Sequence, residues 1–165
     1  MKKEEKVKKE EKAKKEERVT KTGRNSLFPC YSLSSVYTLD FVKLYEKGYR
    51  AAFFDIDNTL VLHDEPARKE TEELFLKLKE IGFKTAILSN NGKERVERFA
   101  KRVGADYYQE NAGKPSPKAY ISAVRFFHLE KEQCLFFGDQ LFTDILGGNR
   151  AGIPTVLVRA MGKEK

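Results

Sequence analysis

The stretch Ala51–Glu65 reads AAFFDIDNTLVLHDE and decides the fold. A short apolar run ends in two aspartates, Asp55 and Asp57, with one residue between them. On an extended chain, side chains at positions i and i+2 point to the same side. The two carboxylates therefore repel each other, and the rest of the sequence has to supply whatever offsets that repulsion.

Apolar runs typical of strands alternate with helical patterns along the chain. We expect strands at 50–55, 83–88, 105–109, 133–137 and 154–158, and helices at Asp40–Lys47, Pro66–Ile81, Lys93–Val103, Ser116–Leu129 and Leu141–Ala151. This alternation predicts parallel strands joined by right-handed crossovers, with helices on both faces of the sheet. The fold class predicted from the sequence is therefore α/β, with a five-stranded parallel sheet.

Two finer expectations concern the segments between these elements. Residues 23–33 have no regular pattern and are expected to form an irregular apolar connector. Asp64 is expected to cap the helix that begins at Pro66, because aspartate is a favoured residue immediately before a helix.

Polar side chains follow four of the predicted strands. In parallel α/β sheets, ligands bind at the carboxyl ends of the strands, so these side chains are expected to meet there. They are Asp55, Asp57 and Thr59 after the first strand, Ser89 and Asn90 after the second, Lys114 after the third, and Asp139 and Asp144 after the fourth.

Other phosphate and metal motifs do not fit this pattern. A calcium loop requires D-x-D-x-[DN]-G, but Thr59 and Leu60 occupy its fifth and sixth positions. A phosphate-binding loop of the form G-x-x-x-x-G-K-[ST] is absent from the sequence. Gly147 and Gly148 follow a helical pattern rather than a strand, which excludes a dinucleotide-binding fingerprint.

Length and composition favour one domain of 26–161, preceded by a charged low-complexity extension of 1–25. The chain has 165 residues, of which 40% are hydrophobic, and it contains no apolar stretch near the roughly 20 residues of a membrane span. The first residues lack the features of a signal peptide, and Cys30 and Cys134 are expected to be reduced. The sequence therefore predicts a cytoplasmic protein.

The net charge of +7 is unevenly distributed. Residues 1–22 contribute +4, and the remaining residues contribute +3. The extension repeats with a period of six, which places its apolar residues on different helix faces and predicts a solvated helix or disorder. Because the folded part is only mildly basic, charge does not favour binding of nucleic acid.

The ordered motifs DIDNTLV, LSNN, GKP and GDQLFTD closely resemble those of the haloacid dehalogenase superfamily of aspartate-nucleophile phosphatases. The sequence around these motifs is similar to that of the YqeG-type branch of subfamily IIIA, which is related to phosphatidylglycerophosphate phosphatases. The resemblance covers roughly residues 27–160. It implies a Rossmann-like fold and hydrolysis of phosphomonoesters with Mg²⁺ as the cofactor.

The resemblance also implies roles for the polar side chains. Asp55 is the implied nucleophile, which is ionised and attacks phosphorus, and Asp57 is the implied acid and base, which is protonated before the reaction. The implied phosphate-binding residues are Ser89, the backbone N–H of Asn90, Lys114 and Thr59, although the hydroxyl of Thr59 is equally explained as stabilising a turn. The implied Mg²⁺ ligands are Asp55, the carbonyl of Asp57 and Asp139, with Asp144 in the second acidic position. His63 and His128 match no motif.

The segments that hold a cap domain in many members of the superfamily are short here. Only about 24 residues separate Thr59 from Phe83. A capless, open site suits a large substrate, such as a phosphatidylglycerophosphate headgroup in a membrane, or a covering partner. Phe28, Tyr31, Tyr37 and Phe41, with the basic extension, are candidates for peripheral membrane contact, although core packing is the ordinary role of such aromatics.

A second hypothesis is that the fold serves as a non-catalytic adaptor or assembly protein that binds RNA or a ribosome-linked GTPase. The complete set of catalytic residue types argues against it. The sequence leaves open the physiological substrate and the oligomeric state.

Overall fold

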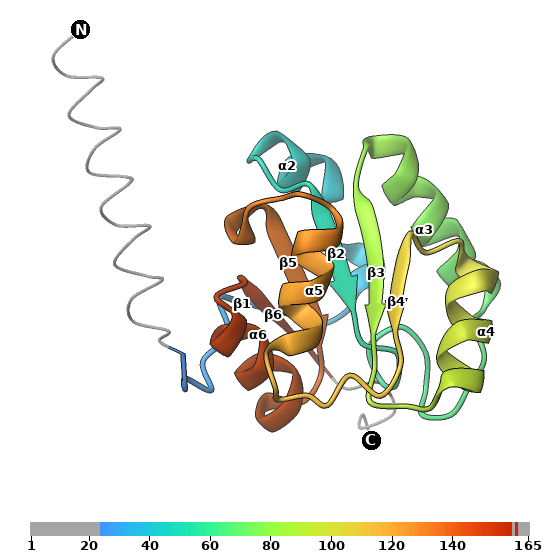
Figure 1. Cartoon of the computed structure of the whole chain (residues 1–165). Coiled ribbons are helices and arrows are strands. Elements are labelled where there is room, and N and C mark those ends of the chain that lie inside the picture. The colour runs from blue at the N-terminus through green and yellow to red at the C-terminus, as the bar shows by residue number, and fades with distance from the viewer. Residues whose placement is uncertain (1–23, 160, 162–165) are drawn as a thin grey trace, which may run out of the picture.

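The computed structural model describes residues 24–159 and Met161, so the predicted extension lies almost wholly outside it. A six-stranded parallel sheet forms the centre of the molecule, in the order β1-β6-β5-β2-β3-β4 (Figure 1). Because neighbouring strands pair in parallel, their carboxyl ends lie at one edge. The strands are β1 (Tyr31–Leu33), β2 (Ala51–Phe54), β3 (Lys84–Leu88), β4 (Tyr107–Gln109), β5 (Cys134–Gly138) and β6 (Thr155–Val158).

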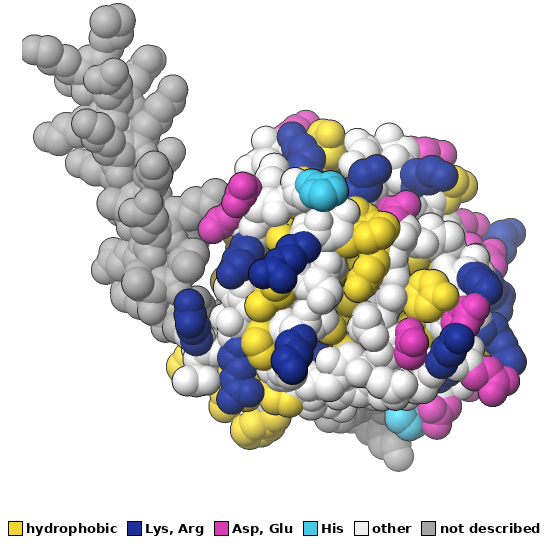
Figure 2. Space-filling model, viewed as in Figure 1, with side chains coloured by type: hydrophobic (Ala, Val, Ile, Leu, Met, Phe, Trp, Pro, Cys, Tyr) yellow, Lys and Arg dark blue, Asp and Glu magenta, His cyan; other side chains and the backbone are white. Residues whose placement is uncertain are grey.

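Helices cover both faces of the sheet. One face packs against α2, α3 and α4, and the other packs against α5 and α6. The outer side of α4 carries Lys, Arg and Glu side chains, so charges of both signs lie close together there (Figure 2). The helices are α2 (Phe41–Glu46), α3 (Lys69–Ile81), α4 (Lys93–Val103), α5 (Lys118–Phe126) and α6 (Leu146–Ala151), with shorter turns η1 (Val36–Thr38), η2 (Lys131–Gln133) and η3 (Leu141–Ile145).

Successive strand residues point to opposite faces and so divide the core in two. Phe54 and Phe137 lie on the face of α2 and α3, and their rings stack with centroids 5.0 Å apart. Phe53 and Phe136 lie on the other face, where Phe136 meets the ring of Tyr120 edge-on at 4.7 Å. Residues on both faces of the central strands are buried, which explains why these strands read as continuous apolar runs.

The prediction of five strands is wrong by one, because residues of the expected irregular connector form β1. This strand pairs with the edge of β6, with Tyr31 opposite Val156 and Leu33 opposite Val158. The side-chain amide of Asn149 donates to the carbonyl groups of Ser26 and Phe28 and holds the preceding segment in place. Two of the three β1 residues are exposed, so the strand lacks the alternating pattern that would have identified it.

The helix boundaries are confirmed in part. Helix α4 has the predicted bounds and ends where Gly104 adopts a left-handed conformation, with φ of 72°. Helix α3 begins at Lys69 rather than Pro66, so Asp64 does not cap it. Residues 55–68 instead form an irregular loop between β2 and α3, and we call its later part, residues 58–68, the flap. The predicted helix Leu141–Ala151 is divided into η3 and α6.

The structure also shows where the aromatic side chains and the two cysteines lie. Phe41 is buried, and the hydroxyl of Tyr37 donates to the carbonyl of Leu60, so core packing accounts for both. Phe28 is 76% exposed, at the amino end of the sheet. Cys30 and Cys134 are free thiols. No helix within residues 24–159 is long and apolar enough to cross a membrane.

Phe137 lies between the rings of Phe41 and Phe54, so we expect Phe137→Ala to leave a cavity at the centre of the larger core. The free energy of unfolding should fall by about 3–5 kcal/mol. Chemical denaturation measures this change. Phe28→Ala is the matched control and should change the free energy by less than about 0.5 kcal/mol, because the ring is mostly exposed. Equal losses in the two variants would contradict this description of the core.

Candidate active site

The candidate site lies at the carboxyl edge of the three middle strands. β2 is hydrogen-bonded to β3 on one side and to β5 on the other. Asp55 follows β2, and its backbone N–H donates to the carbonyl of Phe137 on β5. Ser89 follows β3, and Asp139 follows β5. Parallel pairing therefore brings residues that are far apart in the sequence to the same point.

A buried ion-pair network occupies the centre of the site. The Nζ atom of Lys114 lies 2.5 Å from Oδ1 of Asp144 and 3.0 Å from Oδ1 of Asp55. The Lys114 side chain is only 2% exposed. Burial by itself lowers the pKa of Lys114, but the carboxylates of Asp55 and Asp144 outweigh it and raise the pKa above its usual value. The ammonium group therefore keeps its charge inside the protein.

The pKa values of the two carboxylates are also raised, but for a carboxylate a raised pKa disfavours the charged form. Burial raises the pKa of Asp55 to about 6, against the opposing effect of Lys114. Burial also raises the pKa of Asp144, although Lys114 and the backbone N–H of Gln140 oppose it. One ammonium is thus shared by two carboxylates, which leaves the cluster with a surplus of negative charge.

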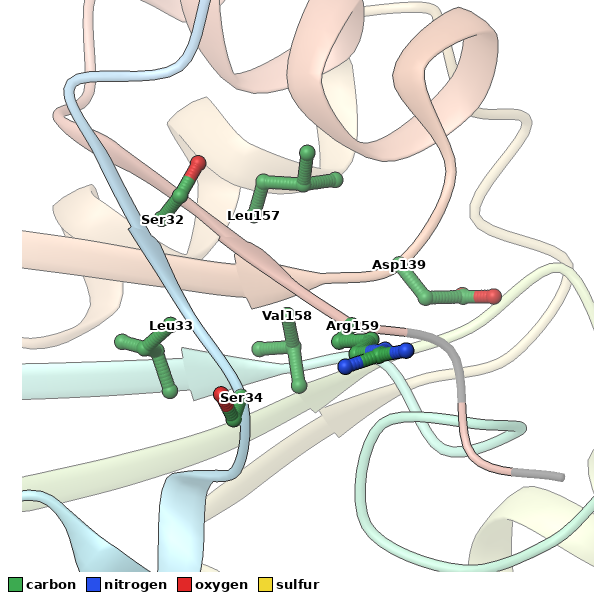
Figure 3. A pocket seen from close by; sticks show the side chains of 7 residues that line it. All are labelled: Ser32, Leu33, Ser34, Asp139, Leu157, Val158 and Arg159. Carbon is green, nitrogen blue, oxygen red and sulfur yellow. The ribbon is translucent and has the colours of Figure 1, made fainter. Parts of the chain in front are cut away.

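A third carboxylate completes this cluster. Oxygen atoms of Asp55, Asp139 and Asp144 all lie within 4.8 Å of one another. Asp139 also lines a cavity of about 490 Å³ at the ends of β1 and β6, together with Ser32 and Arg159 (Figure 3). Carboxylate oxygens are the ligands that Mg²⁺ prefers, so the donor set fits this ion.

Gly138 is required for the close approach of Asp144. A Cβ atom at position 138 would lie 2.5 Å from Oδ2 of Asp144, a distance that real Cβ contacts do not reach. The hydroxyl of Tyr120 donates to the backbone carbonyl of Asp144 at 3.0 Å and fixes the chain from the other side. Residues of β5, α5 and η3 therefore determine the position of the Asp144 carboxylate.

Ser89 and Asn90 lie beside the same cluster. The side-chain amide of Asn90 donates to the carbonyl of Lys114 and accepts from its backbone N–H, at 3.1 and 2.8 Å. Ser89 is buried, and its hydroxyl oxygen accepts from the backbone N–H of Asn91. The side chain of Asn90 thus positions the loop that carries Lys114, a role that the sequence did not predict.

Thr59 is buried in the flap, and its hydroxyl has no hydrogen-bond partner among the described residues. It therefore does not stabilise the turn by a side-chain hydrogen bond. The hydroxyl oxygen is inaccessible to solvent, so direct contact with a ligand requires the flap to move.

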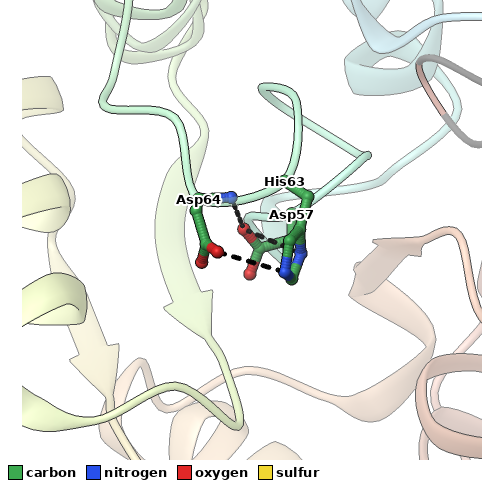
Figure 4. A group of neighbouring side chains, drawn as sticks. All are labelled: Asp57, His63 and Asp64. Atoms are coloured by element: carbon green, nitrogen blue, oxygen red, sulfur yellow. Dashed lines mark hydrogen bonds and ion pairs between the residues drawn. The ribbon is translucent and has the colours of Figure 1, made fainter.

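Asp57 belongs to a separate group of side chains. Its Oδ1 accepts from the backbone N–H of Asp64 at 2.9 Å and from Nη2 of Arg95 at 2.8 Å, and its Oδ2 accepts from the amide of Asn91. His63 lies 3.7 Å away and pairs with Asp64 at 3.2 Å (Figure 4). The two aspartates of the sequence motif therefore make different contacts.

The pKa values of the two aspartates lie in the opposite order to the expected one, in which Asp57 has the higher pKa. Burial raises the pKa of Asp57, but the hydrogen bonds from Asp64 and Asn91 and the charge of Arg95 outweigh it, so its pKa lies below the usual value. Asp55 has the raised pKa instead. The reason is that Asp57 accepts three hydrogen bonds, which favour its ionised form, whereas Asp55 is more deeply buried.

The sequence analysis missed the partners of Asp57. Asn91 is the last residue of the motif LSNN, so a signal for it existed. Arg95 lies in the first turn of α4 and resembles the other charged residues of that helix. His63 is exposed and makes its contacts only because the flap folds back.

The family comparison decides the identity. Residues 61–152 match the model for the haloacid dehalogenase-like hydrolases, a region that includes Ser89, Lys114, Asp139 and Asp144. The chain is 45% identical over 117 residues to the probable phosphatase YqeG of Bacillus subtilis, which covers 70% of this chain and 67% of that protein. The chain belongs to the haloacid dehalogenase-like hydrolase family.

Two more distant similarities agree with this assignment. The chain is 25% identical over 153 residues to phosphatidylglycerophosphate phosphatase 1 of Arabidopsis thaliana, covering 85% of this chain and 43% of that one. An uncharacterised protein of Listeria monocytogenes has a similar fold, with a TM-score of 0.56 and 22% identity over 70% of this chain and 84% of that one. As in the sequence prediction, no cap domain is inserted between the described strands and helices.

Lys114→Gln should be strongly destabilising, because it leaves the buried carboxylates of Asp55 and Asp144 without their cation. Removing one partner of a buried ion pair costs about 3–5 kcal/mol of unfolding free energy. Chemical denaturation in the presence of a chelator measures the loss. Lys101→Gln on the outside of α4 is the matched control, since it removes only an exposed pair with Glu97 and should cost less than about 1 kcal/mol. A loss as small as that of the control would show that the network is not important for stability.

Proposed function

We propose that this protein is a Mg²⁺-dependent phosphatase that hydrolyses phosphomonoesters through a covalent intermediate on Asp55. The observation that carries the proposal is the buried ammonium of Lys114 between Asp55 and Asp144, with Asp139 in the same cluster. Binding of a phosphate group at this point requires positive charge, and attack on phosphorus requires a carboxylate close to that charge. The cluster holds both groups in a fixed relative position.

Mg²⁺ would be held by the carboxylates of Asp55, Asp139 and Asp144 and by the backbone carbonyl of Asp57. When bound, the ion neutralises negative charge on the carboxylates and on the phosphate oxygens. Lys114 contributes a second positive charge, which lies against Asp55 and Asp144. The hydroxyl of Ser89 and the backbone N–H of Asn90 are proposed to donate to the phosphate oxygens.

In the first step, a carboxylate oxygen of Asp55 forms a bond to phosphorus while the bond to the leaving oxygen breaks. Asp57 donates a proton to that oxygen, and the alcohol departs. In the second step, Asp57 takes a proton from a water molecule that attacks phosphorus. The bond to Asp55 then breaks, which releases inorganic phosphate and restores both carboxyl groups.

The contacts of Asp57 add a condition to this mechanism. Asp57 is held ionised by Asp64, Asn91 and Arg95, so it cannot donate a proton in this arrangement. We propose that an arriving substrate replaces at least one of these hydrogen bonds and raises the pKa of Asp57. The flap is the segment that would move, because it is irregular and contributes the N–H of Asp64.

Phosphatidylglycerophosphate, or another large phosphomonoester, is the proposed substrate class. The similarity to the Arabidopsis phosphatase supports the lipid, although the matched region is less than half of that protein. Leu62, Leu141 and Phe142 are exposed large apolar side chains, and they follow the carboxyl ends of the adjacent strands β2 and β5. Apolar side chains at this edge suit a headgroup presented by a membrane, whereas Phe28 lies at the opposite edge.

Asp55→Asn should reduce phosphatase turnover to background, because it removes the attacking oxygen anion while nearly preserving the shape. Asp57→Asn should reduce kcat by a factor on the order of 10²–10⁴, and least for substrates with good leaving groups. Turnover of a panel of phosphomonoesters in the presence of Mg²⁺ measures both effects. Asp40→Asn is the control and should keep full activity, because asparagine also caps α2. Full activity in folded Asp55→Asn would end this proposal.

Beryllium fluoride with Mg²⁺ should raise the melting temperature of the wild-type protein, because it mimics a phosphoryl group on Asp55. Ligands that bind only the folded state stabilise it by an amount that grows with the logarithm of their concentration divided by Kd. The increase should be absent in Asp55→Asn and after addition of a metal chelator. An equal increase in wild type and Asp55→Asn would place the binding elsewhere. Differential scanning fluorimetry distinguishes these outcomes without an activity assay.

A further inference from the structure

A second cavity, of about 700 Å³, lies between the flap and helix α4. The side chains that line it include the buried Ala67 and Phe99 and a group of four cations, which we call the basic rim: Lys93, Arg95, Arg98 and Arg102. Neither the family assignment nor the cluster around Lys114 accounts for this cavity. Its lining combines apolar surface with positive charge.

The cavity is directly connected to Asp57. Arg95 lines the cavity and donates from Nη2 to Oδ1 of Asp57 at 2.8 Å. Asp64 also lines the cavity, and its backbone N–H donates to the same oxygen. In the proposed mechanism, Asp57 protonates the leaving oxygen. The leaving group therefore departs beside side chains that form the wall of this cavity.

The charges around the cavity favour an anion. Four cationic side chains line it against two carboxylates, those of Asp64 and Glu94. Two of the four are also paired with carboxylates outside the lining, Arg95 with Asp57 and Arg102 with Glu72, so Lys93 and Arg98 are the cations that a ligand would meet. Lys93 forms no ion pair within 4 Å in residues 24–159, so its charge is available to a ligand. Arg98 pairs with Glu94 at 2.8 Å, but both side chains are more than 70% exposed. Exposed pairs of this kind contribute little stability, so an anion can replace Glu94 as the partner of Arg98.

We propose that this cavity binds a second anionic group carried by the leaving alcohol, an inference that rests on the proposed phosphatase function. The substrate class is then a phosphomonoester whose alcohol carries another phosphate or a phosphodiester a few bonds away. The short carbon chain between the two groups would lie along Ala67 and Phe99, and the second anion would meet Lys93 and Arg98. A soluble bisphosphate and a lipid headgroup with a phosphodiester share this chemistry.

A matched pair of esters tests the proposal on the full-length protein with Mg²⁺. 3-Hydroxypropyl phosphate and propane-1,3-diyl bisphosphate differ only in the second phosphate. We expect kcat/KM to be at least about tenfold higher for the bisphosphate at low salt, and the ratio to fall as ionic strength rises. A short-chain phosphatidylglycerophosphate serves as the third substrate. Higher efficiency with this lipid than with the bisphosphate identifies the phosphodiester as the preferred anion, and the reverse identifies a soluble bisphosphate.

Variants on α4 assign the effect to the basic rim. Lys93→Gln should lower the ratio of the two kcat/KM values by about two- to fivefold, because one charge contact is lost. Glu94→Gln should raise it, because the change removes a competing carboxylate and frees Arg98. Lys101→Gln is the matched control, since it makes the same change on the same helix outside the cavity, and the ratio should not change.

Two results would overturn the proposal, and they are distinguishable. The first result is equal efficiency toward both esters in the wild type, or an unchanged ratio when Lys93 and Arg98 are both changed to glutamine. Either outcome excludes binding of the second anion in the cavity but leaves the phosphatase proposal intact. Hydrolysis of neither ester, nor of the lipid, excludes both proposals. Circular dichroism and the melting temperature establish that each variant is folded.

Discussion

The buried ammonium of Lys114 is the constraint on which the rest of the site depends. A charge inside a protein is tolerated only where opposite charges and hydrogen bonds replace water. Asp55 and Asp144 supply the charges, and the side chain of Asn90 fixes the loop that carries the lysine. Gly138 has no side chain because Asp144 occupies the space that a Cβ atom would need. Residues that follow three different strands, β2, β4 and β5, are thus held together by one cation.

The same constraint explains why Asp55 and Asp57 are not equivalent. Asp55 belongs to the buried cluster, where desolvation opposes its charge. Asp57 turns toward the flap and α4, where Asn91 and Arg95 donate to it. The repulsion expected for two carboxylates at i and i+2 is therefore relieved by separate partners rather than by a shared proton. This separation gives the flap and α4 direct influence over the group proposed to protonate the leaving alcohol.

The surroundings of the cluster differ on its two sides. On the side of α4, the basic rim offers positive charge above an apolar floor. Beside Asp139, Leu141 and Phe142 expose apolar side chains after β5. No cap domain is inserted between the described strands and helices, so in the proposed function these surfaces at the carboxyl edge of the sheet would contact the substrate. In the proposed function, a phospholipid whose headgroup ends in a phosphomonoester would contact both surfaces, because it carries a second anion in the phosphodiester and apolar acyl chains.

The sequence by itself determined the central strands, helix α4 and the polar side chains that follow the strands. Buried parallel strands require long apolar runs, and α4 carries Val96, Phe99 and Val103 on one face with a terminating glycine. These patterns involve residues that are close together in the sequence, so they can be recognised before the fold is known. The polar side chains after the strands could be assigned to one site because parallel strands share a carboxyl edge.

Only the tertiary structure decided the features that depend on contacts distant in sequence. Strand β1 forms because the edge of β6 is available, and its own residues carry no alternating pattern. The flap replaces the predicted start of α3 because Asp64 turns back to Asp57. The order of the pKa values of Asp55 and Asp57 is the reverse of the expected one, because it depends on burial and on hydrogen-bond donors such as Arg95, which lies 38 residues beyond Asp57. A pKa is set by everything that surrounds a group in space, and the spacing of two aspartates along the chain does not contain that information.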